Sequence, residues 1–358
     1  MLPSPTTLTL VLSQAISLAT HSWEYGTAAQ ALLEWDTPSH SIWNAPFPHG
    51  NGKLPTLDVD DVSALKYARP FIRTDRETLV DGDGAAGDPA ALGIPALLIG
   101  QSTPPYLAAA LRQQTHLLTV VPRAPNGAIS HRETSVSLWA DFIYMVPPFL
   151  AYSGVASSDL GLLKEAAQQC AHYADVLGTP PGPWLHIVPG EGAADQTKDL
   201  QLWSTGNGWA AAGMARVLAT ARKSGFDAQT KGEQAMLSEA IKEIVDGTIR
   251  LDDDGSVLLR NYVNDTTWFG EVSGTALIAA TVLRMAVLMP DMFGAEYTEW
   301  AVRKKDVVDG RIDGKTGIVA PAVNPLNWKD RTPFTSGSPE GQAFVILLHA
   351  AYRDWKAE

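Results

Sequence analysis

One ionisable side chain lies in the middle of a long apolar and aromatic segment, which makes it the best candidate for chemistry. The segment covers residues 137–155, and the ionisable group is Asp141. A helical conformation would place Leu138, Phe142 and Met145 beside this carboxyl. Burial disfavours the charged form of a carboxyl and can raise its pKa by as much as ~3–5 units. Asp141 is therefore a candidate general acid, although a buried Asp that caps a helix or bonds to backbone explains the pattern equally well.

A second segment combines tryptophan with glycine over residues 202–210, Leu-Trp-Ser-Thr-Gly-Asn-Gly-Trp-Ala. Its two glycines allow backbone close to a ligand, and Trp203 and Trp209 offer flat faces to a sugar ring. Asn207 can either cap the helix that follows or contact substrate hydroxyls. Two core tryptophans around a helix start are the structural alternative.

Helical spacing of apolar residues recurs along the chain, with Pro and Gly in the breaks. Some patterns, such as 276–283, are apolar nearly all round, which is typical of helices buried on more than one side. Helices are expected at 7–19, 26–35, 60–72, 89–100, 104–119, 137–154, 158–177, 207–224, 232–250, 271–289, 293–305 and 338–356. The pattern predicts one large all-α domain over 1–358. Hairpins or irregular loops are expected at 249–259, where 254–255 is an Asp-Gly turn signal, and at 310–319.

Composition excludes several classes of function. The chain has 358 residues, 45% of them hydrophobic, and a net charge of -12. Because no basic cluster exceeds residues 303–305, nucleic acid is not an expected partner. A single cysteine, Cys170, excludes an internal disulfide.

Residues 8–19 could pass as the apolar part of a signal peptide. However, no Lys or Arg precedes them, and their apolar residues follow the spacing of an amphipathic helix. We therefore interpret them as part of the folded domain and expect a cytoplasmic protein, with secretion as the alternative. No apolar run approaches the ~18 residues of a membrane span.

Both chemical segments resemble one family. Trp139-Ala-Asp141-Phe-Ile-Tyr-Met145 resembles the catalytic segment of the unsaturated glucuronyl and rhamnogalacturonyl hydrolases. Residues 202–210 are similar to the Trp-x-x-Gly-Asn-x-Trp element of that family. Trp184-Leu-His186 lies where the family places an active-site histidine, and the segment beginning Gly87-Asp88 resembles the one that carries a second aspartate.

The resemblance extends from about Ser22 to Phe344, because 270–275 and 338–344 resemble segments that shape the pocket rim. It implies the all-α, six-hairpin (α/α)6 barrel. It also implies a hydrolase that removes a 4,5-unsaturated uronic acid from the non-reducing end of lyase-generated oligosaccharides. The site residues implied are Asp141 as the catalytic acid, with Asp88, Trp139, His186, Trp203, Asn207 and Trp209 as substrate-binding residues.

The chemistry of such a hydrolase needs a proton donor and no metal, nucleotide or redox cofactor. Protonation of C4 in the C4=C5 bond places positive charge on C5 and the ring oxygen, and water then adds at C5. The resemblance implies that Asp141 gives this proton, Asp88 accepts hydrogen bonds from hydroxyls, and His186 contacts substrate or water. An oligosaccharide with a terminal unsaturated uronate is thus the expected partner.

One position departs from the family pattern. Many bacterial members carry Arg two residues after the first tryptophan of the second segment, where this chain has Thr205. Arg132, Lys198 or Arg331 can replace that charge, and the sequence does not choose among them.

The two segments resemble the rhamnogalacturonyl branch more closely, which favours a pectin-derived substrate over a glucuronyl one. A sugar epimerase or isomerase and a non-catalytic sugar-binding protein are alternatives of other classes.

Overall fold

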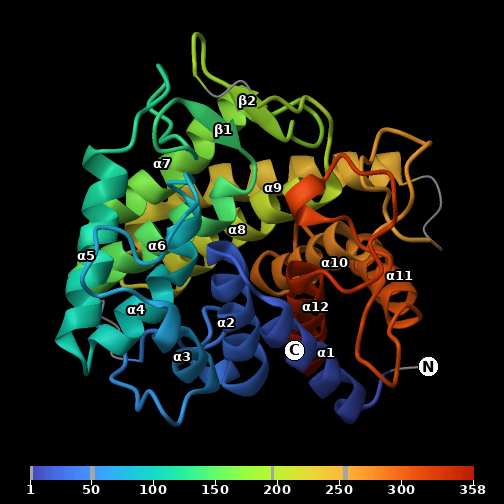
Figure 1. Ribbon diagram of the computed structural model, residues 1–358, viewed down its shortest axis with the longest axis horizontal. Coiled ribbons are helices and arrows are strands. Elements are labelled where there is room, and N and C mark those ends of the chain that lie inside the picture. The colour runs from blue at the N-terminus through green and yellow to red at the C-terminus, as the bar shows by residue number, and fades with distance from the viewer. Residues whose placement is uncertain (1–2, 49–52, 195–196, 253–256) are drawn as a thin grey trace.

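Helices make up most of the protein, whose computed structural model describes residues 3–48, 53–194, 197–252 and 257–358 (Figure 1). The α-helices are α1 Pro5–Leu18, α2 Ser22–Asp36, α3 Ser63–Ala68, α4 Gly93–Gly100, α5 Pro104–Thr119, α6 Phe142–Ser157, α7 Leu160–Leu177, α8 Ser204–Lys223, α9 Lys231–Leu251, α10 Val272–Leu288, α11 Ala295–Asp309 and α12 Pro339–Ala357. Short 3-10 helices are η1 Pro38–His40, η2 Arg69–Phe71, η3 Asp88–Leu92, η4 Asp227–Thr230 and η5 Pro325–Asn327. The strands β1 Ser137–Trp139 and β2 Ile187–Pro189 pair antiparallel.

The even-numbered helices form a closed inner ring. In chain order, α2, η3 with α4, α6, α8, α10 and α12 each pack against the next, and α12 packs against α2. These helices are buried almost all round, and in α8 every residue from Ser204 to Ala221 is buried. The sequence pattern of wholly apolar helices is explained by this position.

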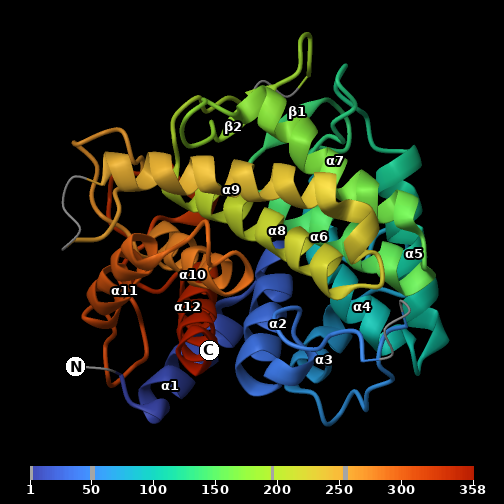
Figure 2. The same cartoon turned by 180° about the vertical axis from the view of Figure 1, so that it is seen from behind.

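The odd-numbered helices form an outer layer, and each packs on inner helices. Figure 2 shows α9 lying across the outside of α8. This helix is amphipathic, since it buries Leu237, Ile241, Ile244 and Val245 and exposes most of its charged residues. At the ends of the chain, α1 packs against α12. The predicted all-α, (α/α)6 architecture is confirmed.

Two prolines in α6 leave backbone carbonyls facing its neighbour α8 without their helical hydrogen bonds. Pro147 and Pro148 lack an N–H, so the carbonyls four residues earlier, those of Ile143 and Tyr144, lose their helical donors. The Tyr144 carbonyl instead accepts a hydrogen bond of 3.0 Å from Nη1 of Arg216. A Cβ on Gly213 would lie only 2.1 Å from the Ile143 oxygen, so α8 approaches this turn closely because residue 213 is glycine.

The predicted helix over 137–154 is wrong at its beginning. Residues 137–139 form β1, and α6 begins at Phe142, so Asp141 immediately precedes the helix instead of lying within it. Residues 137–139 form a strand because they pair with β2. Since β2 lies about 50 residues further along the chain, the local sequence pattern carries no sign of this pairing. The other expected helices are all found, with 60–72 and 89–100 divided between a 3-10 helix and an α-helix.

The first expected helix is confirmed as amphipathic, since Leu8, Val11, Leu12 and Ala15 of α1 are buried. No helix in the described part of the chain is long and apolar enough to cross a bilayer. Near 310–319, Ile312 and Val319 form an isolated antiparallel bridge. The expected turn at 254–255 lies outside the described residues.

Candidate active site

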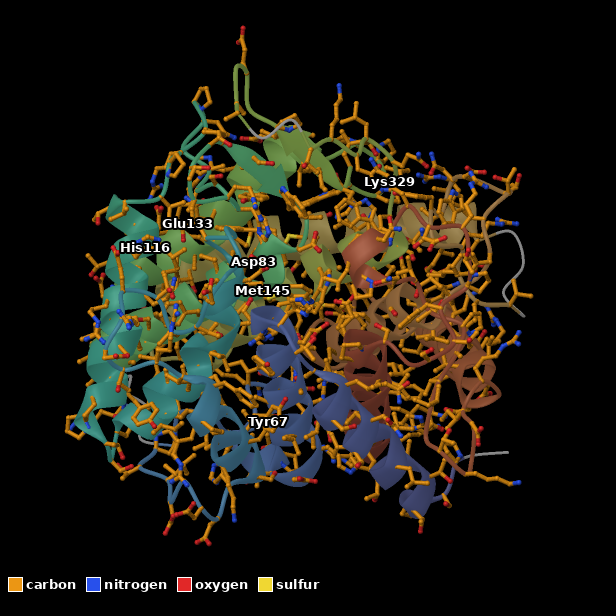
Figure 3. The ribbon with its side chains drawn as sticks, viewed as in Figure 1. Tyr67, Asp83, His116, Glu133, Met145 and Lys329 are labelled. Carbon is orange, nitrogen blue, oxygen red and sulfur yellow. The ribbon has the colours of Figure 1, made fainter. Side chains whose placement is uncertain are left out.

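A cavity of about 180 Å³ lies at the end of the barrel where the inner helices begin. His21, Asp88, Asp141, Trp203 and Glu340 line it, and each lies at or next to the first residue of an inner helix. Loops 82–85, 131–132 and 325–328 complete the wall. Two further lining residues, Asp83 and Met145, are labelled near the centre of Figure 3.

Asp141 belongs to a chain of polar groups that passes through His186. Its Oδ2 lies 3.3 Å from Nε2 of His186, whose Nδ1 lies 3.0 Å from Oδ2 of Asp199. Asp199 also accepts hydrogen bonds from the Tyr262 hydroxyl and the Trp328 indole N–H. The imidazole therefore bridges two carboxylates, and only the Asp141 end, with 18% of its side chain exposed, reaches the cavity.

The charges in this chain stabilise one another. Burial alone would lower the pKa of His186, but Asp141 and Asp199 on either side outweigh it and raise that pKa. Burial acts to raise the pKa of Asp199, yet hydrogen bonds from His186 and Tyr262 prevail and lower it. The two carboxylates thus favour the protonated form of His186, and His186 in turn favours the charged form of Asp199.

Asp88 is a cavity carboxyl with a raised pKa. Burial, followed by the nearby charge of Asp141, raises the pKa of Asp88 to about 8, although Arg132 acts in the opposite direction. Oδ1 of Asp88 also lies 3.7 Å from Nε2 of His131. At neutral pH the site therefore contains a neutral carboxyl close to Asp141.

The predicted surroundings of Asp141 are wrong in part. Its carboxyl is neither fully buried nor enclosed by apolar side chains, because it borders the cavity and His186. Of these two neighbouring carboxyls, Asp88 is the one whose pKa is raised by burial.

Three indoles surround His186 and form an aromatic wall. The imidazole centroid lies 4.3 Å from that of Trp203, 5.0 Å from that of Trp328 and 5.9 Å from that of Trp139. Trp203 is held by its indole N–H, which donates to Oδ1 of Asn261 at 2.8 Å. All three indoles line the cavity. Flat aromatic faces beside carboxyl groups suit the apolar face and hydroxyls of a sugar ring.

Most residues of this cavity lie in a part of the chain that matches a known protein family. Residues 88–352, which contain most of these groups, match the family described as Glycosyl Hydrolase Family 88. The chain belongs to glycosyl hydrolase family 88. No curated protein matches it. As a family 88 glycosidase it is an enzyme, and the cavity is its candidate active site.

Solved structures share the fold of this family 88 chain at low identity. A possible member of the GH105 family from Klebsiella pneumoniae has a TM-score of 0.74 and 15% identity, with 98% of this chain and 94% of that chain covered. A glycosyl hydrolase family 88 protein from Bacteroides vulgatus has a TM-score of 0.69 and 14% identity, with 97% of this chain and 98% of that chain covered. An unsaturated glucuronyl hydrolase specific for heparin has a TM-score of 0.66 and 12% identity, with 98% of this chain and 96% of that chain covered.

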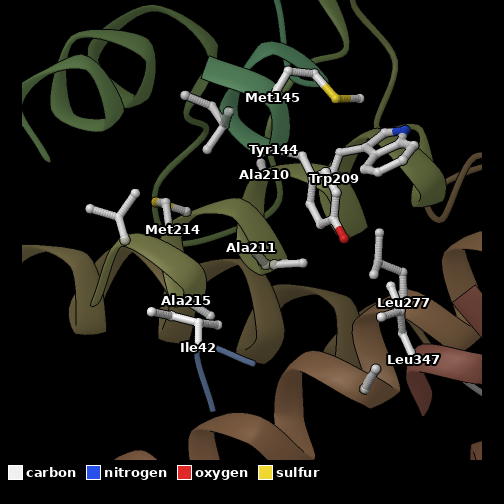
Figure 4. Close-up of a cluster of buried hydrophobic side chains, with 14 of the residues drawn as sticks. Ile42, Tyr144, Met145, Trp209, Ala210, Ala211, Met214, Ala215, Leu277 and Leu347 are labelled. Carbon is white, nitrogen blue, oxygen red and sulfur yellow. The ribbon is translucent and has the colours of Figure 1, made fainter. Parts of the chain in front are cut away.

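Two residues predicted to bind substrate lie in the core of this family 88 chain. Trp209 is 1% exposed and packs edge-on against Tyr144 and Phe344, within the cluster drawn in Figure 4. Asn207 is also 1% exposed, and its amide bonds to the backbone of Trp184 and Trp203. Neither lines the cavity. The structure places both in the packed interior and not at the cavity wall, because they lie four and six residues after Trp203, farther along α8 into the barrel.

Sequence reasoning missed three residues of this family 88 site. Asp199 and Trp328 complete the surroundings of His186, and neither lies in a helix with a recognisable pattern. Glu340 also lines the cavity, and its buried Oε1 has no hydrogen-bond partner among the described residues. Burial, with the charges of Glu24 and Asp141, raises the pKa of Glu340 well above its usual range. The only sequence signal for Glu340 is its place within 338–344, a segment that resembles a rim segment of the family and begins a helix.

No group of three or more His, Cys, Asp or Glu side chains suited to a metal ion occurs among the described residues.

Proposed function

We propose that this glycosidase removes a 4,5-unsaturated uronic acid from the non-reducing end of lyase-generated oligosaccharides, with rhamnogalacturonan or other pectin fragments as the preferred source. The supporting observation is the pair of interacting carboxyls, Asp88 and Asp141, in one indole-lined cavity of a family 88 chain. An unsaturated substrate needs one proton and one water, and a pair that holds a proton at neutral pH can deliver it.

Asp141 is our choice for the group that transfers the proton. It is the more exposed member of the pair, with 18% of its side chain accessible against 11% for Asp88. It also borders His186, whose raised pKa makes the imidazole a local source of the proton that Asp141 carries into the reaction. Asp88 keeps its own proton and hydrogen-bonds to the sugar.

The reaction balances with these groups alone. The C4=C5 π electrons take the proton from Asp141 and form the C4–H bond, which leaves positive charge shared between C5 and the ring oxygen. Water adds at C5 and gives its proton to the Asp141 carboxylate, which restores the acid. The hemiketal formed at C5 opens, and C1 becomes an aldehyde as the aglycone leaves as an alcohol. The indoles of Trp139, Trp203 and Trp328 keep bulk water from the charged intermediate.

The source of the uronate is the finer part of the proposal. Residues 139–151 and 203–209 resemble the rhamnogalacturonyl branch, and solved structures with this fold include possible members of the GH105 family. Another is an unsaturated glucuronyl hydrolase specific for heparin, so a glucuronyl substrate is the second candidate. Family membership argues against the epimerase and sugar-binding alternatives.

Bleaching of the ultraviolet absorbance of the conjugated C4=C5 bond tests the proposal. The wild-type protein should bleach unsaturated disaccharides from rhamnogalacturonan lyase faster than those from glycosaminoglycan lyases. Asp141→Asn should fold and bind but turn over at least about 100-fold more slowly, as expected for the loss of acid catalysis. Trp209→Phe, a core substitution in the same barrel, serves as the matched control and should retain activity. If Asp141→Asn keeps wild-type turnover, Asp141 has no catalytic role; if no lyase product bleaches, the proposed activity is wrong.

A further inference from the structure

We propose that Arg132 binds the carboxylate of the unsaturated uronate, and that the cavity accepts a sugar carrying no second anionic group such as a sulfate. This inference rests on the proposed function and names its substrate class more closely. Thr205 stands where many bacterial members of the family carry Arg, so another residue must supply the positive charge.

Thr205 cannot contact the substrate carboxylate. Its side chain is buried at 0% exposure, and its hydroxyl donates to Oε1 of Glu271 at 3.1 Å. Glu271 caps α10 through the backbone N–H groups of Ser273 and Gly274. An arginine at 205 would therefore displace a helix cap, and the charge for the substrate must come from elsewhere.

Of the three cations that could replace it, only Arg132 lines the cavity. Arg331 lies outside, where it stacks on Trp268 with its Cζ 4.6 Å from the ring centroid and lies 3.6 Å from Asp265. Lys198 does not line the cavity either, and its carbonyl accepts a hydrogen bond from Lys329, which is labelled in Figure 3. Position alone therefore selects Arg132.

The backbone around Arg132 is shaped to hold its guanidinium at the cavity wall. Arg132 bridges Ala85 in antiparallel pairing, and its N–H donates to Oγ of Ser130 at 3.0 Å. Gly84 has a φ of +80°, and a Cβ there would lie 2.8 Å from Nη2 of Arg132. Glycine at 84 thus serves two needs, a left-handed turn and room for the guanidinium. A planar guanidinium held in this way can pair with a carboxylate through two parallel hydrogen bonds.

The cavity offers one fixed cation to an anionic sugar. Apart from imidazoles, Arg132 is the only cationic side chain among the described lining residues. A sulfate on the ring would compete with the uronate carboxylate for this one guanidinium. An unsulfated sugar is therefore preferred.

Kinetics with matched substrates test the role of Arg132. Arg132→Gln should raise KM for the unsaturated disaccharide about 10- to 100-fold, the range expected for a lost charge-assisted hydrogen bond, and Arg132→Lys should fall between. The methyl ester of the same disaccharide lacks the charge, so wild type and Arg132→Gln should treat it alike. Arg331→Gln, which removes a cation outside the cavity, should leave KM unchanged. Circular dichroism checks that each variant folds.

Opposite outcomes would overturn the inference. An unchanged KM in Arg132→Gln, or equal losses on the acid and its ester, removes Arg132 from carboxylate binding. We expect the unsulfated disaccharide to be turned over at least about 10-fold faster than its 2-O-sulfated counterpart. Equal turnover of the two would show that the cavity does not exclude a second anionic group. Failure of the proposed function is distinguishable, because wild type would then bleach no substrate. In that case calorimetric binding of galacturonate and galactose to wild type and Arg132→Gln decides whether Arg132 selects a carboxylate.

Discussion

Asn207 offers a sharp test of the difference between a binding residue and a structural one. Its Oδ1 accepts the backbone N–H of Trp184 at 2.6 Å, and its Nδ2 donates to the carbonyls of Trp184 and Trp203 at 3.0 and 2.9 Å. One buried amide thus ties the segment before His186 to the first turn of α8. Asn207→Ala removes all three bonds.

The cost follows from the groups left behind. The Trp203 carbonyl keeps a partner, the N–H of residue 207, but the described structure offers the two Trp184 backbone groups no other hydrogen bond. A buried polar group without a partner costs ~1–3 kcal/mol, so Asn207→Ala should destabilise the protein by about 2–6 kcal/mol. That is a large part of the ~5–15 kcal/mol that typically stabilises a folded domain.

Urea unfolding followed by tryptophan fluorescence measures this effect, with Asn44→Ala as the control because Asn44 is exposed and its side chain makes no hydrogen bond in the described structure. The midpoint should fall markedly for Asn207→Ala and stay unchanged for Asn44→Ala. Below the transition, turnover per folded molecule of Asn207→Ala should remain within a few-fold of wild type. A variant as stable as wild type that has lost turnover by 100-fold or more would show that Asn207 contacts substrate and refute the structural role.

Two further predictions concern the core and pH. Trp209→Ala should destabilise the protein by ~3–5 kcal/mol, the usual cost of truncating a buried Trp, whereas Trp209→Phe should cost less; equal stability of Trp209→Ala and wild type in urea would contradict the core position. Asp88 has its pKa raised from 3.8 to about 8, so the folded state keeps a proton that the unfolded state releases. Its stabilising contribution is complete below pH ~4 and is lost as pH rises to about 8. Unfolding measured across this range should show falling stability in wild type and a shallower fall in Asp88→Asn, and an unaltered slope would show that Asp88 is ionised in the folded protein.

The local pattern of the sequence was sufficient for most of the fold. Helices α5, α7 and α9 lie within a few residues of their predicted bounds, because apolar spacing and Pro or Gly breaks are local properties of the chain. It failed at 137–141, where β1 forms only because 187–189 returns to pair with it. Pairing over such a separation leaves no periodic signal within a short window.

The site divides in the same way. Segments of unusual composition identified Asp141 and Trp203, the family resemblance added Asp88 and His186, and all four line one cavity. The sequence could not separate Trp203 from Trp209, because a difference of six residues around a helix start decides between cavity and core. Only the tertiary structure decided that.

Tertiary structure alone also decided that the pKa of Asp88 is raised. Burial and the charge of a neighbour set the pKa of Asp88, and both depend on packing among η3, α6 and the 131–132 loop. The partners of His186 at 199 and 328 arrive from distant loops. Residue types thus specify which reactions are possible, whereas distances and exclusion of water, which only the closed ring creates, select the groups that act.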